Sequence, residues 1–465
     1  MTDLTNHKHI HCIGIGGIGL SAIAEIFLAR GCRVSGSDMK ASDVTERLQR
    51  DGAIIYTEHR AENIDGCDLV IYSAAVSADN PELKEAAVRK IKTMSRAEVL
   101  GCLMDGYKTS IAVSGTHGKT TTTSMISLIL KNADLDPTIL VGGNLSEIGG
   151  NVKVGDSDYF VTEACEYMDS FLSLRPKIEI ILNIDSDHLD YFKDIDHIAN
   201  SFDRFSKLVP EDGHVVAYSS NPFVSSLLGE LKCNVVTFGF DEQCDYYAAD
   251  IDFSSAGMPS FDIYHLGARQ CSIQLAIPGE HNIANALAAF ACCRTLGIDA
   301  DSIASTLKRF TGTQRRFDVI GITSNNVKIV DDYAHHPTEI KATLKAARNI
   351  PFSRLWCIFQ PHTYTRTLAL FDDFAGAFSD ADVIVMAEIY AAREKNIHKI
   401  SSRELVEKIR TEFPEKEILF IQDFDEIADF LLEKAAPNDL VITMGAGDIY
   451  KVAEKIIDKD AAAAQ

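Results

Sequence analysis

The sequence predicts an α/β protein of three domains, with mainly parallel sheets covered by helices. The chain has 465 residues, which is more than one ordinary hydrophobic core accommodates. Short apolar runs of strand length alternate with helix-like segments, and this alternation restarts near residues 106 and 312. We therefore expect a Rossmann-like domain over residues 1–106, a central domain over residues 107–312 and a second Rossmann-like domain over residues 313–465.

Within these domains, the spacing of apolar residues indicates the individual elements. Residues 9–15, 33–37 and 69–73 predict strands of the first domain, with a helix over residues 18–30. From residue 246 to residue 278, short β-like runs separated by Gly, Ser and Pro predict a small antiparallel region added to the central domain. The other expected strands are 110–114, 158–164, 178–184, 327–330, 355–359, 383–387, 418–421 and 440–443, and further helices are expected over 120–132 and 282–296.

Charge and cysteine content argue against several classes of protein. The formal net charge of −22 disfavours nucleic acid as a partner, because nucleic acids bind surfaces rich in Lys and Arg. Eleven cysteines, an odd number without a C-x-x-C pair, indicate reduced thiols and not a disulfide framework. No signal-peptide pattern is visible, and no apolar run is long enough to span a bilayer. We expect a cytoplasmic protein without membrane insertion.

A first glycine motif, Gly-Ile-Gly-Gly-Ile-Gly, occupies residues 14–19 between an expected strand and helix. Glycines let the backbone approach a diphosphate, and the start of the helix supplies amide donors and positive potential. Asp38 ends the next expected strand, where an acidic side chain can hold a ribose hydroxyl. Taken alone, the motif is compatible with a nicotinamide dinucleotide, with another diphosphate ligand, or with a purely structural turn.

A second glycine motif, Gly-Thr-His-Gly-Lys-Thr, occupies residues 115–120, again between a strand and a helix. Loop amides of this kind cradle phosphates, the lysine neutralises the terminal phosphates, and the hydroxyl that follows can bind magnesium. Val113 stands where the first glycine of the usual eight-residue pattern would fall. A dehydrogenase needs no ATP loop, and a simple kinase needs no second dinucleotide-like domain. The two loops together therefore predict binding of ATP and of a second nucleotide conjugate.

Further polar segments follow expected strands, where α/β domains bind ligands. Glu163 lies at the end of one expected strand, and His188 lies in an acidic run after the next. Carboxylates at such positions suit magnesium, although acidic loops are often merely solvated. Asn282 and Asn285 open a helix, where amides suit an adenine edge or simply cap and pack the helix. The remaining segments are Arg-Arg-Phe at 315–317, Asp-Asp-Tyr-Ala-His-His-Pro-Thr-Glu at 331–339 and Gln-Pro-His-Thr-Tyr-Thr-Arg-Thr at 360–367.

Taken together, these motifs resemble those of the Mur ligase family, over almost the whole chain from residue 9 to residue 450. The resemblance implies that the first domain binds a UDP moiety and not NAD. It is most similar to the branch that joins L-alanine to the carboxylate of UDP-N-acetylmuramate through an acyl phosphate, with ATP as co-substrate, in peptidoglycan synthesis. The alternatives are the branch that attaches a tripeptide to the same sugar acid and, at a distance, an NAD-dependent oxidoreductase.

The resemblance also implies roles for individual residues. Lys119, Glu163, His188 and His335 would be catalytic, with Mg²⁺ (or Mn²⁺) held by Thr120, Glu163 and His188 and no carbamylated lysine. Tyr333, His335 and Arg366 would surround the amino acid. ATP would contact Gly115, Thr116, His117, Gly118, Lys119, Thr120, Thr121, His281, Asn282, Asn285, Arg316 and Asp332. The UDP-sugar would contact Gly14, Gly16, Gly17, Gly19, Ser37, Asp38, His59, Ser73 and Arg96.

Two positions depart from the pattern of the family. Many relatives carry an arginine where this chain has Thr363, so one expected carboxylate contact is missing, and Cys165 stands where others have aspartate. The family also implies that the third domain swings onto the ATP domain. We expect a monomer or a weak homodimer with small-molecule substrates.

Overall fold

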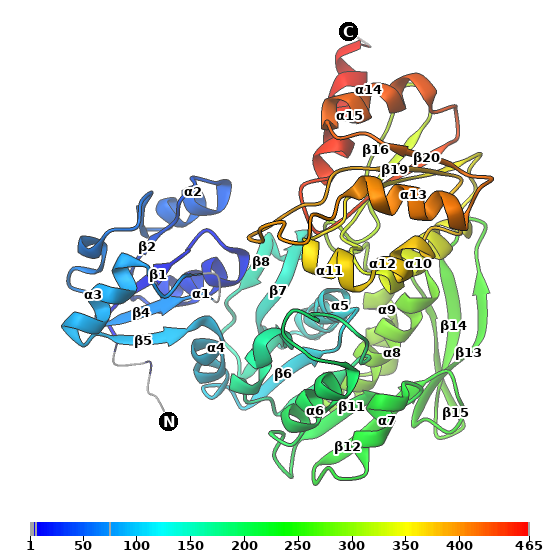
Figure 1. The fold of residues 1–465 in the computed structure, drawn as a ribbon. Coiled ribbons are helices and arrows are strands. Elements are labelled where there is room, and N and C mark those ends of the chain that lie inside the picture. Colours follow the sequence, from blue (N-terminus) through cyan, green and yellow to red (C-terminus); the bar gives the residue numbers. More distant parts are fainter. Residues whose placement is uncertain (1–3, 5–6, 74–75, 464–465) are drawn as a thin grey trace.

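The structure, a computed structural model, describes residue 4 and residues 7–73 and 76–463. Within this part of the chain the strands form three sheets, one in each of the three expected domain ranges. Figure 1 shows the N-terminal domain to one side of the central domain and the C-terminal domain above the central one. The prediction of a three-domain α/β fold is confirmed, and the boundaries near residues 106 and 312 stay predictions.

The N-terminal domain is a parallel sheet covered by helices. Its strands are β1 (His9–Ile13), β2 (Arg33–Ser37), β3 (Ile54–Tyr56), β4 (Leu69–Tyr72) and β5 (Lys92–Ser95), and its helices are α1 (Ile18–Ala29), α2 (Asp43–Arg50), α3 (Pro81–Arg89) and α4 (Arg96–Met104), with a 3-10 helix η1 (Ala61–Ile64). The strand order is β3-β2-β1-β4-β5, so the direction of winding reverses between β1 and β4. Ligands of such sheets bind at the carboxyl ends of the strands near this reversal.

The central domain is built on one long mixed sheet. Its strands are β6 (Thr109–Ser114), β7 (Thr138–Leu145), β8 (Gly150–Lys153), β9 (Tyr159–Glu163), β10 (Ile178–Ile181), β11 (His214–Tyr218), β12 (Asn234–Gly239), β13 (Tyr246–Phe253), β14 (Pro259–His265) and β15 (Ala268–Gln274). Their order is β15-β14-β13-β12-β11-β10-β6-β9-β7-β8. The strands from β13 to β7 run parallel, whereas β13, β14 and β15 pair antiparallel. The expected antiparallel region therefore extends the sheet at one edge.

The helices of the central domain are α5 (Lys119–Asn132), α6 (Ile195–Ser206), α7 (Pro222–Leu228), α8 (Glu280–Thr295) and α9 (Ala300–Arg309), with 3-10 helices η2 (Ser146–Ile148) and η3 (Tyr167–Ser173). Helix α5 packs against α8 and α9. All residues of α5 from Thr120 to Leu130 are buried, although the first turn is rich in threonine. A helix that is buried on all sides belongs to the interior of a domain, so the start of α5 is held firmly.

One predicted strand is too long. The apolar run at residues 178–184 predicts a strand that continues to Ile184, but β10 ends at Ile181. From Leu182 onward the chain turns toward the start of α5, because Asn183 Oδ1 accepts a hydrogen bond from the amide of His117 at 2.8 Å and Asn183 O accepts one from Thr116. Bonds to the glycine loop thus replace bonds to the sheet.

The C-terminal domain carries a six-stranded sheet in the order β16-β17-β21-β18-β19-β20, parallel except for the edge strand β16. Its strands are β16 (Asp318–Ile322), β17 (Lys328–Asp332), β18 (Leu355–Phe359), β19 (Val383–Met386), β20 (Glu417–Phe420) and β21 (Leu440–Met444). Its helices are α10 (Pro337–Arg348), α11 (Tyr364–Ala369), α12 (Phe371–Ala375), α13 (Ser402–Glu412), α14 (Phe424–Lys434) and α15 (Tyr450–Ala463). In the described part of the chain, no helix is both long and apolar enough to cross a membrane.

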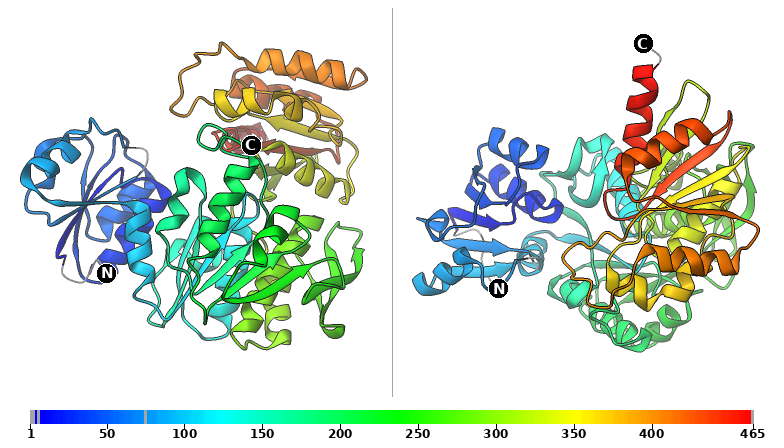
Figure 2. Two further views of the ribbon diagram at one scale, coloured as in Figure 1. Left: turned by 60° about the horizontal axis from the view of Figure 1, so that its bottom comes forward. Right: turned by 45° about the horizontal axis from the view of Figure 1, so that its top comes forward.

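Both flanking domains contact the central one but at different places. Figure 2 shows the N-terminal domain beside the hairpin of β7 and β8, and Asn151 of β8 donates to the carbonyl of Ile18 in α1 at 2.9 Å. The C-terminal domain contacts the segments that follow β6 and β10, through the contacts of His117 with Glu339 and of His336 with Ser186, and α10 lies near α8. The phosphate loop therefore faces the C-terminal domain.

A buried carboxyl group lies in the central sheet, directly behind the phosphate loop. Glu179 of β10 is fully buried; Oε1 accepts a hydrogen bond from Ser114 at 3.0 Å, and Oε2 has no partner among the described residues. Burial raises the pKa of Glu179 to about 8, and the nearby hydroxyl groups of Ser206 and Ser114 oppose this effect only in part. Because the folded state holds the proton more tightly than the unfolded state, stability should fall as pH rises from about 4.5 to about 8.

We expect Glu179→Gln to stabilise the central domain at pH 8.5 by about 2–4 kcal/mol, since one pKa unit corresponds to about 1.4 kcal/mol. At pH 4 the two proteins should unfold at the same urea concentration, because the carboxyl group is neutral in both states. Urea unfolding at the two pH values measures the difference. Equal destabilisation at both would show that the amide itself packs badly and that ionisation has no part.

Candidate functional site

The phosphate loop lies between β6 and α5, where the sequence predicts it. Gly115 and Gly118 have φ angles of +135° and +85°, which residues with a side chain rarely adopt. A Cβ on Gly118 would also lie 2.5 Å from Oδ1 of Asn285, so glycine lets α8 approach the loop. The unpaired amides at the start of α5 then point out of the loop, which suits a phosphate.

Lys119 is held inside its own loop. Its Nζ donates to the carbonyl oxygens of Gly115 and Thr116 and lies 2.9 Å from Oε2 of Glu166. Both side chains are nearly buried, with exposed fractions of 16% and 3%. Burial alone would lower the pKa of Lys119, but Glu166, together with Cys165 and Glu163, raises that pKa above its usual value. A cation is thus in place where phosphates would arrive.

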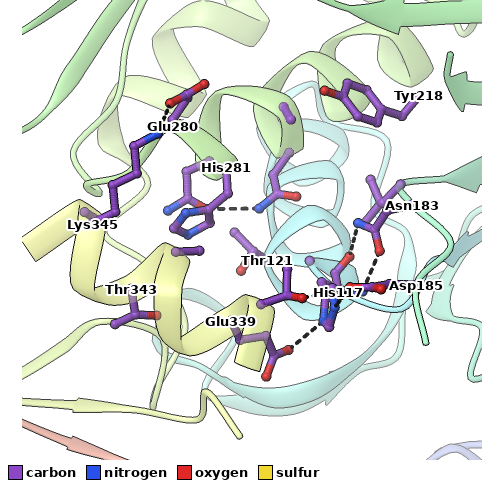
Figure 3. A pocket seen from close by; sticks show the side chains of 18 of the residues that line it. His117, Thr121, Asn183, Asp185, Tyr218, Glu280, His281, Glu339, Thr343 and Lys345 are labelled. Atoms are coloured by element: carbon purple, nitrogen blue, oxygen red, sulfur yellow. Dashed lines mark hydrogen bonds and ion pairs between the residues drawn. The ribbon is translucent and has the colours of Figure 1, made fainter. Parts of the chain in front are cut away.

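A cavity of about 750 Å³ lies between the central and C-terminal domains, beside this loop. Figure 3 shows His117 and Asp185 from the central domain opposite Glu339 and Thr343 of α10, with Tyr218 further along the wall. Aromatic rings at the ends of β11 to β13 make that wall apolar. The predicted ATP residues that line the cavity are His117, Gly118, Thr121, His281, Asn282, Asn285, Arg316 and Asp332, while Gly115, Thr116, Lys119 and Thr120 complete the adjoining loop.

Burial sets the protonation of two of these residues. It lowers the pKa of His281 to about 4, so the imidazole is neutral at pH 7. It raises the pKa of Asp332 to about 6, against the effect of Arg316 and of amides from Phe317 and Ala334. Asn282 donates to the carbonyl of residue 278 and accepts from Asn285, so the two amides are locked together. A nucleobase would meet rigid polar groups here.

His117 joins the two domains. Its Nε2 lies 3.2 Å from Oδ2 of Asp185 in the central domain, and its Nδ1 lies 3.1 Å from Oε1 of Glu339 in the C-terminal domain. Thr338 also donates to Asp185, and His336 donates to the carbonyl of Ser186. Burial would lower the pKa of His117, but the two carboxylates raise it to about 9. The charged imidazole therefore connects two acids across the domain boundary.

The cluster of His117, Asp185 and His336 does not have the chemistry of a metal site. Ligand atoms of His117, Asp185 and His336 lie within 4.8 Å of one another. However, His336 Nδ1 accepts a hydrogen bond from the amide of Thr338, so the neutral ring carries its proton on Nε2. Such a ring has no free lone pair for a cation. We assign the group to the contact between domains.

The raised pKa of His117 predicts that domain docking weakens at alkaline pH. Asp185 belongs to the same domain as His117 and stays beside it in the undocked form, so only Glu339 makes the docked form bind the proton more tightly. This contribution to docking is lost as pH rises through about 9. The population of the docked form should fall by about tenfold or more between pH 7 and pH 10. Small-angle scattering, or energy transfer between dyes on the two domains, would follow this change.

His117→Gln should lose most of this pH dependence, because no imidazole remains to titrate between the two acids. His265→Gln is the matched control, since His265 stacks on Tyr246 in the hairpin region. The control should keep the slope of the wild type. An unchanged slope in His117→Gln would show that another group causes it.

Thr120 and Glu163, two of the three predicted magnesium residues, lie beside the glycine pair 142–143. Glu163 Oε1 accepts from the amide of Gly142 at 2.5 Å, and a Cβ on Gly143 would lie 3.3 Å from Thr120. Among the described residues Oε2 of Glu163 has no hydrogen-bond donor, so it is available to a cation. His188, the third predicted metal residue, faces Glu166, with its Nε2 4.0 Å from Oε1 of that residue. The oxygen donors of Thr120 and Glu163 fit Mg²⁺.

The three predicted amino-acid residues lie on the C-terminal domain near the boundary. His335 Nδ1 donates to the carbonyl of Tyr333 at 3.0 Å, which leaves Nε2 as an acceptor in the neutral ring. Arg366 is already paired: its Nη2 lies 2.9 Å from Oδ1 of Asp187 in the central domain, and both side chains are about nine-tenths buried. The structure thus gives Arg366 a protein carboxylate as its partner, which the sequence does not reveal.

Two departures from the family pattern can now be placed. Thr363 has a φ of +65°, an unusual value for a β-branched residue. Its amide donates to the carbonyl of Tyr390 at 2.9 Å, and its own carbonyl accepts from Thr367. Cys165 is partly exposed beside Glu166, and burial raises the pKa of its thiol. Neither residue replaces the charge that is missing.

The predicted UDP-sugar residues gather at the carboxyl edge of the N-terminal sheet. The glycine loop follows β1, Ser37 ends β2, His59 follows β3, Ser73 follows β4, and Arg96 follows β5. A Cβ on Gly19 would lie 3.0 Å from Nη1 of Arg96, so glycine lets this guanidinium lie against α1. Asp38 accepts from the amide of Gly16 at 2.9 Å and shapes the loop. The residues predicted here are Gly14, Gly16, Gly17, Gly19, Ser37, Asp38, His59, Ser73 and Arg96.

Three acids with a clear place in the site were not singled out from the sequence. Glu166 pairs with the loop lysine, Asp187 with Arg366, and Glu339 with His117 and His335. The sequence signal was present, since each lies in a polar run that follows a strand. Their partners come from other strands or from another domain, so local patterns do not identify the pairs.

A lysine-tipped glycine loop facing a second α/β domain across a deep cavity defines a nucleotide-dependent enzyme. Three family models match the chain: Mur ligase family, catalytic domain, over residues 9–108; Mur ligase middle domain over 113–293; and Mur ligase, glutamate ligase domain, over 315–447. The chain belongs to the Mur ligase family.

Similar proteins cover nearly the full length. A UDP-N-acetylmuramate–L-alanine ligase from Acetivibrio thermocellus is 51% identical over 456 residues, which are 98% of this chain and 97% of the relative. One from Clostridium botulinum is 50% identical, with 97% and 98% covered. The crystal structure of a UDP-N-acetylmuramate–alanine ligase from Thermotoga maritima matches with a TM-score of 0.84 and 29% identity, over 98% of this chain and 100% of that one. A murein peptide ligase from Psychrobacter arcticus, at 24% identity and a TM-score of 0.74 over 97% and 98%, shares the fold.

Proposed function

We propose that this chain joins L-alanine to the carboxylate of UDP-N-acetylmuramate, with conversion of ATP to ADP and phosphate, in the synthesis of peptidoglycan. The observation that carries the proposal is identity of about half over almost the full length to ligases named for this reaction. The cavity between two domains, with the phosphate loop at its edge, supports it. ATP and two small-molecule substrates then account for all three domains.

The reaction needs an activated carboxylate, because a carboxylate is a poor electrophile. Its oxygen attacks the γ-phosphorus of ATP, the bond to ADP breaks, and an acyl phosphate forms. Lys119 holds the terminal phosphates and stabilises the negative charge that develops on them. Leaving the pair with Glu166 frees the lysine for this role.

Magnesium fits the oxygen donors of Thr120 and Glu163, and His188 is proposed to hold a second ion. When bound, the metal would neutralise phosphate charge and align the phosphates for transfer. The protein groups do the remaining work here: the loop amides orient the phosphates and α10 closes the cavity from the other side. Mg²⁺, or Mn²⁺ in its place, is therefore part of the proposal.

In the second step, the neutral amine of alanine attacks the acyl carbon and phosphate leaves. The free Nε2 of His335 supports a role in positioning or deprotonating the ammonium, because Nδ1 is bound to a carbonyl. Tyr333 and Arg366 are proposed to surround the alanine, with Arg366 shared between Asp187 and the substrate. An unchanged rate and alanine KM in His335→Ala would exclude this role for His335.

A phosphate-release assay with UDP-N-acetylmuramate, ATP and Mg²⁺ tests the function. L-alanine should support release, glycine and L-serine less so, and the tripeptide L-Ala-γ-D-Glu-meso-diaminopimelate should not. Release with the tripeptide alone would instead favour the recycling reaction. If no amine supported release above the level of a Lys119→Ala blank, both ligase hypotheses would be wrong. EDTA should abolish the activity. We further propose that the protein acts in the cytoplasm as a monomer or weak homodimer, which sedimentation would test.

A further inference from the structure

A buried glutamate lies beneath the proposed UDP-sugar site. Glu82 of α3 has a fully buried side chain, yet no lysine or arginine pairs with it among the described residues. Instead Ser37 Oγ donates to its Oε2 at 2.7 Å and Asn63 Nδ2 donates to its Oε1 at 2.7 Å. His59 Nδ1 lies 3.0 Å from Oε2, and His11 Nε2 lies 3.5 Å from Oε1.

His11 lies within β1, whereas the other partners come from segments at the carboxyl ends of neighbouring strands. Ser37 ends β2, His59 and Asn63 follow β3, and Glu82 itself lies at the start of the helix after β4. Ser37 extends the connection to the glycine loop, because its backbone carbonyl accepts from the amides of Gly14 at 2.7 Å and Ile15 at 3.1 Å. One carboxylate therefore links the segments that follow four neighbouring strands.

Glu82 also fixes the proton position on His59. A carboxylate only accepts hydrogen bonds, so Nδ1 of His59 must carry the proton that faces it. Burial alone would raise the pKa of Glu82, but donors from His11, Asn63 and Ser37 lower it to about 2, and the group is ionised at any working pH. The other ring nitrogen, Nε2, has no hydrogen-bond partner among the described residues, and the side chain is 23% exposed.

A purely stabilising role explains this arrangement less well. Burying an ion costs several kcal/mol, and apolar side chains of the same size usually stabilise a domain as well or better. Here the ion is retained, and two of its partners, Ser37 and His59, are residues proposed to bind the ligand. Such supporting contacts are how sites hold their binding groups in one orientation.

We infer that Glu82 is a positioning residue for the uridine-diphosphate-sugar site: its buried carboxylate holds Ser37 and His59, and through Ser37 the glycine loop, in the arrangement that binds the ligand. The inference rests on the proposed function, because the ligand class comes from it. Glu82 itself does not touch the ligand.

The test compares Glu82→Gln with Glu25→Gln, a matched control in the same domain whose carboxylate pairs with Arg47 between α1 and α2. Calorimetry with UDP as the probe should show at least a tenfold weaker Kd for Glu82→Gln and less than a twofold change for the control. The KM for UDP-N-acetylmuramate should rise in parallel, while kcat and the KM values for ATP and alanine stay within twofold. A common shift of all three KM values would overturn the inference.

Two further measurements, one on the wild type and one on His59→Gln alone, do not depend on how well Glu82→Gln folds. Nitrogen NMR of the wild type should show His59 protonated at Nδ1; a neutral ring protonated at Nε2 alone would overturn the inference. His59→Gln should also weaken UDP binding. The double variant of Glu82 and His59 should bind UDP no more weakly than the worse single variant, and additive losses would contradict the model.

A wild type that binds UDP but releases no phosphate would overturn the proposed function alone. A wild type that does not bind UDP would overturn this inference.

Discussion

Replacement of Lys119 by alanine is expected to slow phosphate release by about a thousandfold or more, in line with the loss of a cation that stabilises phosphoryl transfer. The ammonium is charged, nearly buried and at the tip of the glycine loop. Its loss removes the positive charge that compensates the terminal phosphates. The residues of the C-terminal domain that are proposed to bind the substrate alanine stay unchanged. Phosphate release at saturating substrates measures the effect, and the KM for alanine should change little.

Two comparisons make this result specific. Lys131→Ala removes a lysine from the last turn of the same helix, where its ammonium contacts the carbonyl of Glu147, and should keep full activity. Lys119→Ala also leaves Glu166 buried without its cation, which destabilises the fold as well as removing the charge from the loop. The double variant Lys119→Ala, Glu166→Gln should recover stability but not activity. Recovery of activity would contradict a direct role for Lys119 in the reaction.

Asp187→Asn is expected to lower kcat/KM for alanine by about 100-fold, equivalent to roughly 3 kcal/mol. Burial alone would raise the pKa of Asp187, but Arg366 and neighbouring imidazoles hold it well below its usual range. Loss of one partner of a buried ion pair costs about 3–5 kcal/mol when the other charge stays buried. Because this pair joins two domains, the interface can open and rehydrate Arg366. The cost should then appear as a shift toward an open form.

Scattering distinguishes this explanation from a local effect on alanine. The unliganded Asp187→Asn protein should have a larger radius of gyration than the wild type. Asp203→Asn is the control, since it removes one partner of the exposed pair with Lys207 in the central domain and should cost less than about 1 kcal/mol. An unchanged radius with the same kinetic loss would place the effect in the alanine site instead of the domain arrangement.

Local signals in the sequence were sufficient for most of the fold. The strand expected at residues 355–359 coincides with β18, because an unbroken run of five apolar residues of this length favours a buried strand. The run at residues 178–184 shows the limit. The side chain of Asn183 accepts a hydrogen bond from the backbone amide of His117 in the phosphate loop, 66 residues away. Nothing within the run at residues 178–184 indicates this long-range contact, which ends the strand early.

The same limit applies to the site. The glycine loops were predictable because positive φ angles restrict the residue type at single positions, as at Gly118. The pairing of Arg366 with Asp187 was not, since the two residues are 179 positions apart and each charge has several plausible partners. Sequence motifs thus identify the groups that a ligand needs, whereas domain contacts decide which of them are already occupied.

The contact between Lys119 and Glu166 has a consequence for the enzyme before any substrate arrives. An empty loop with an unpaired lysine would attract every small anion in the surrounding solution, because its helix start and its ammonium both favour negative charge. Here two carbonyl oxygens and a carboxylate already occupy the ammonium. A single phosphate or sulfate ion would have to replace those bonds with only a few contacts of its own. A triphosphate offers more oxygen atoms and therefore replaces them more readily. The resting loop is thereby shielded from simple inorganic ions.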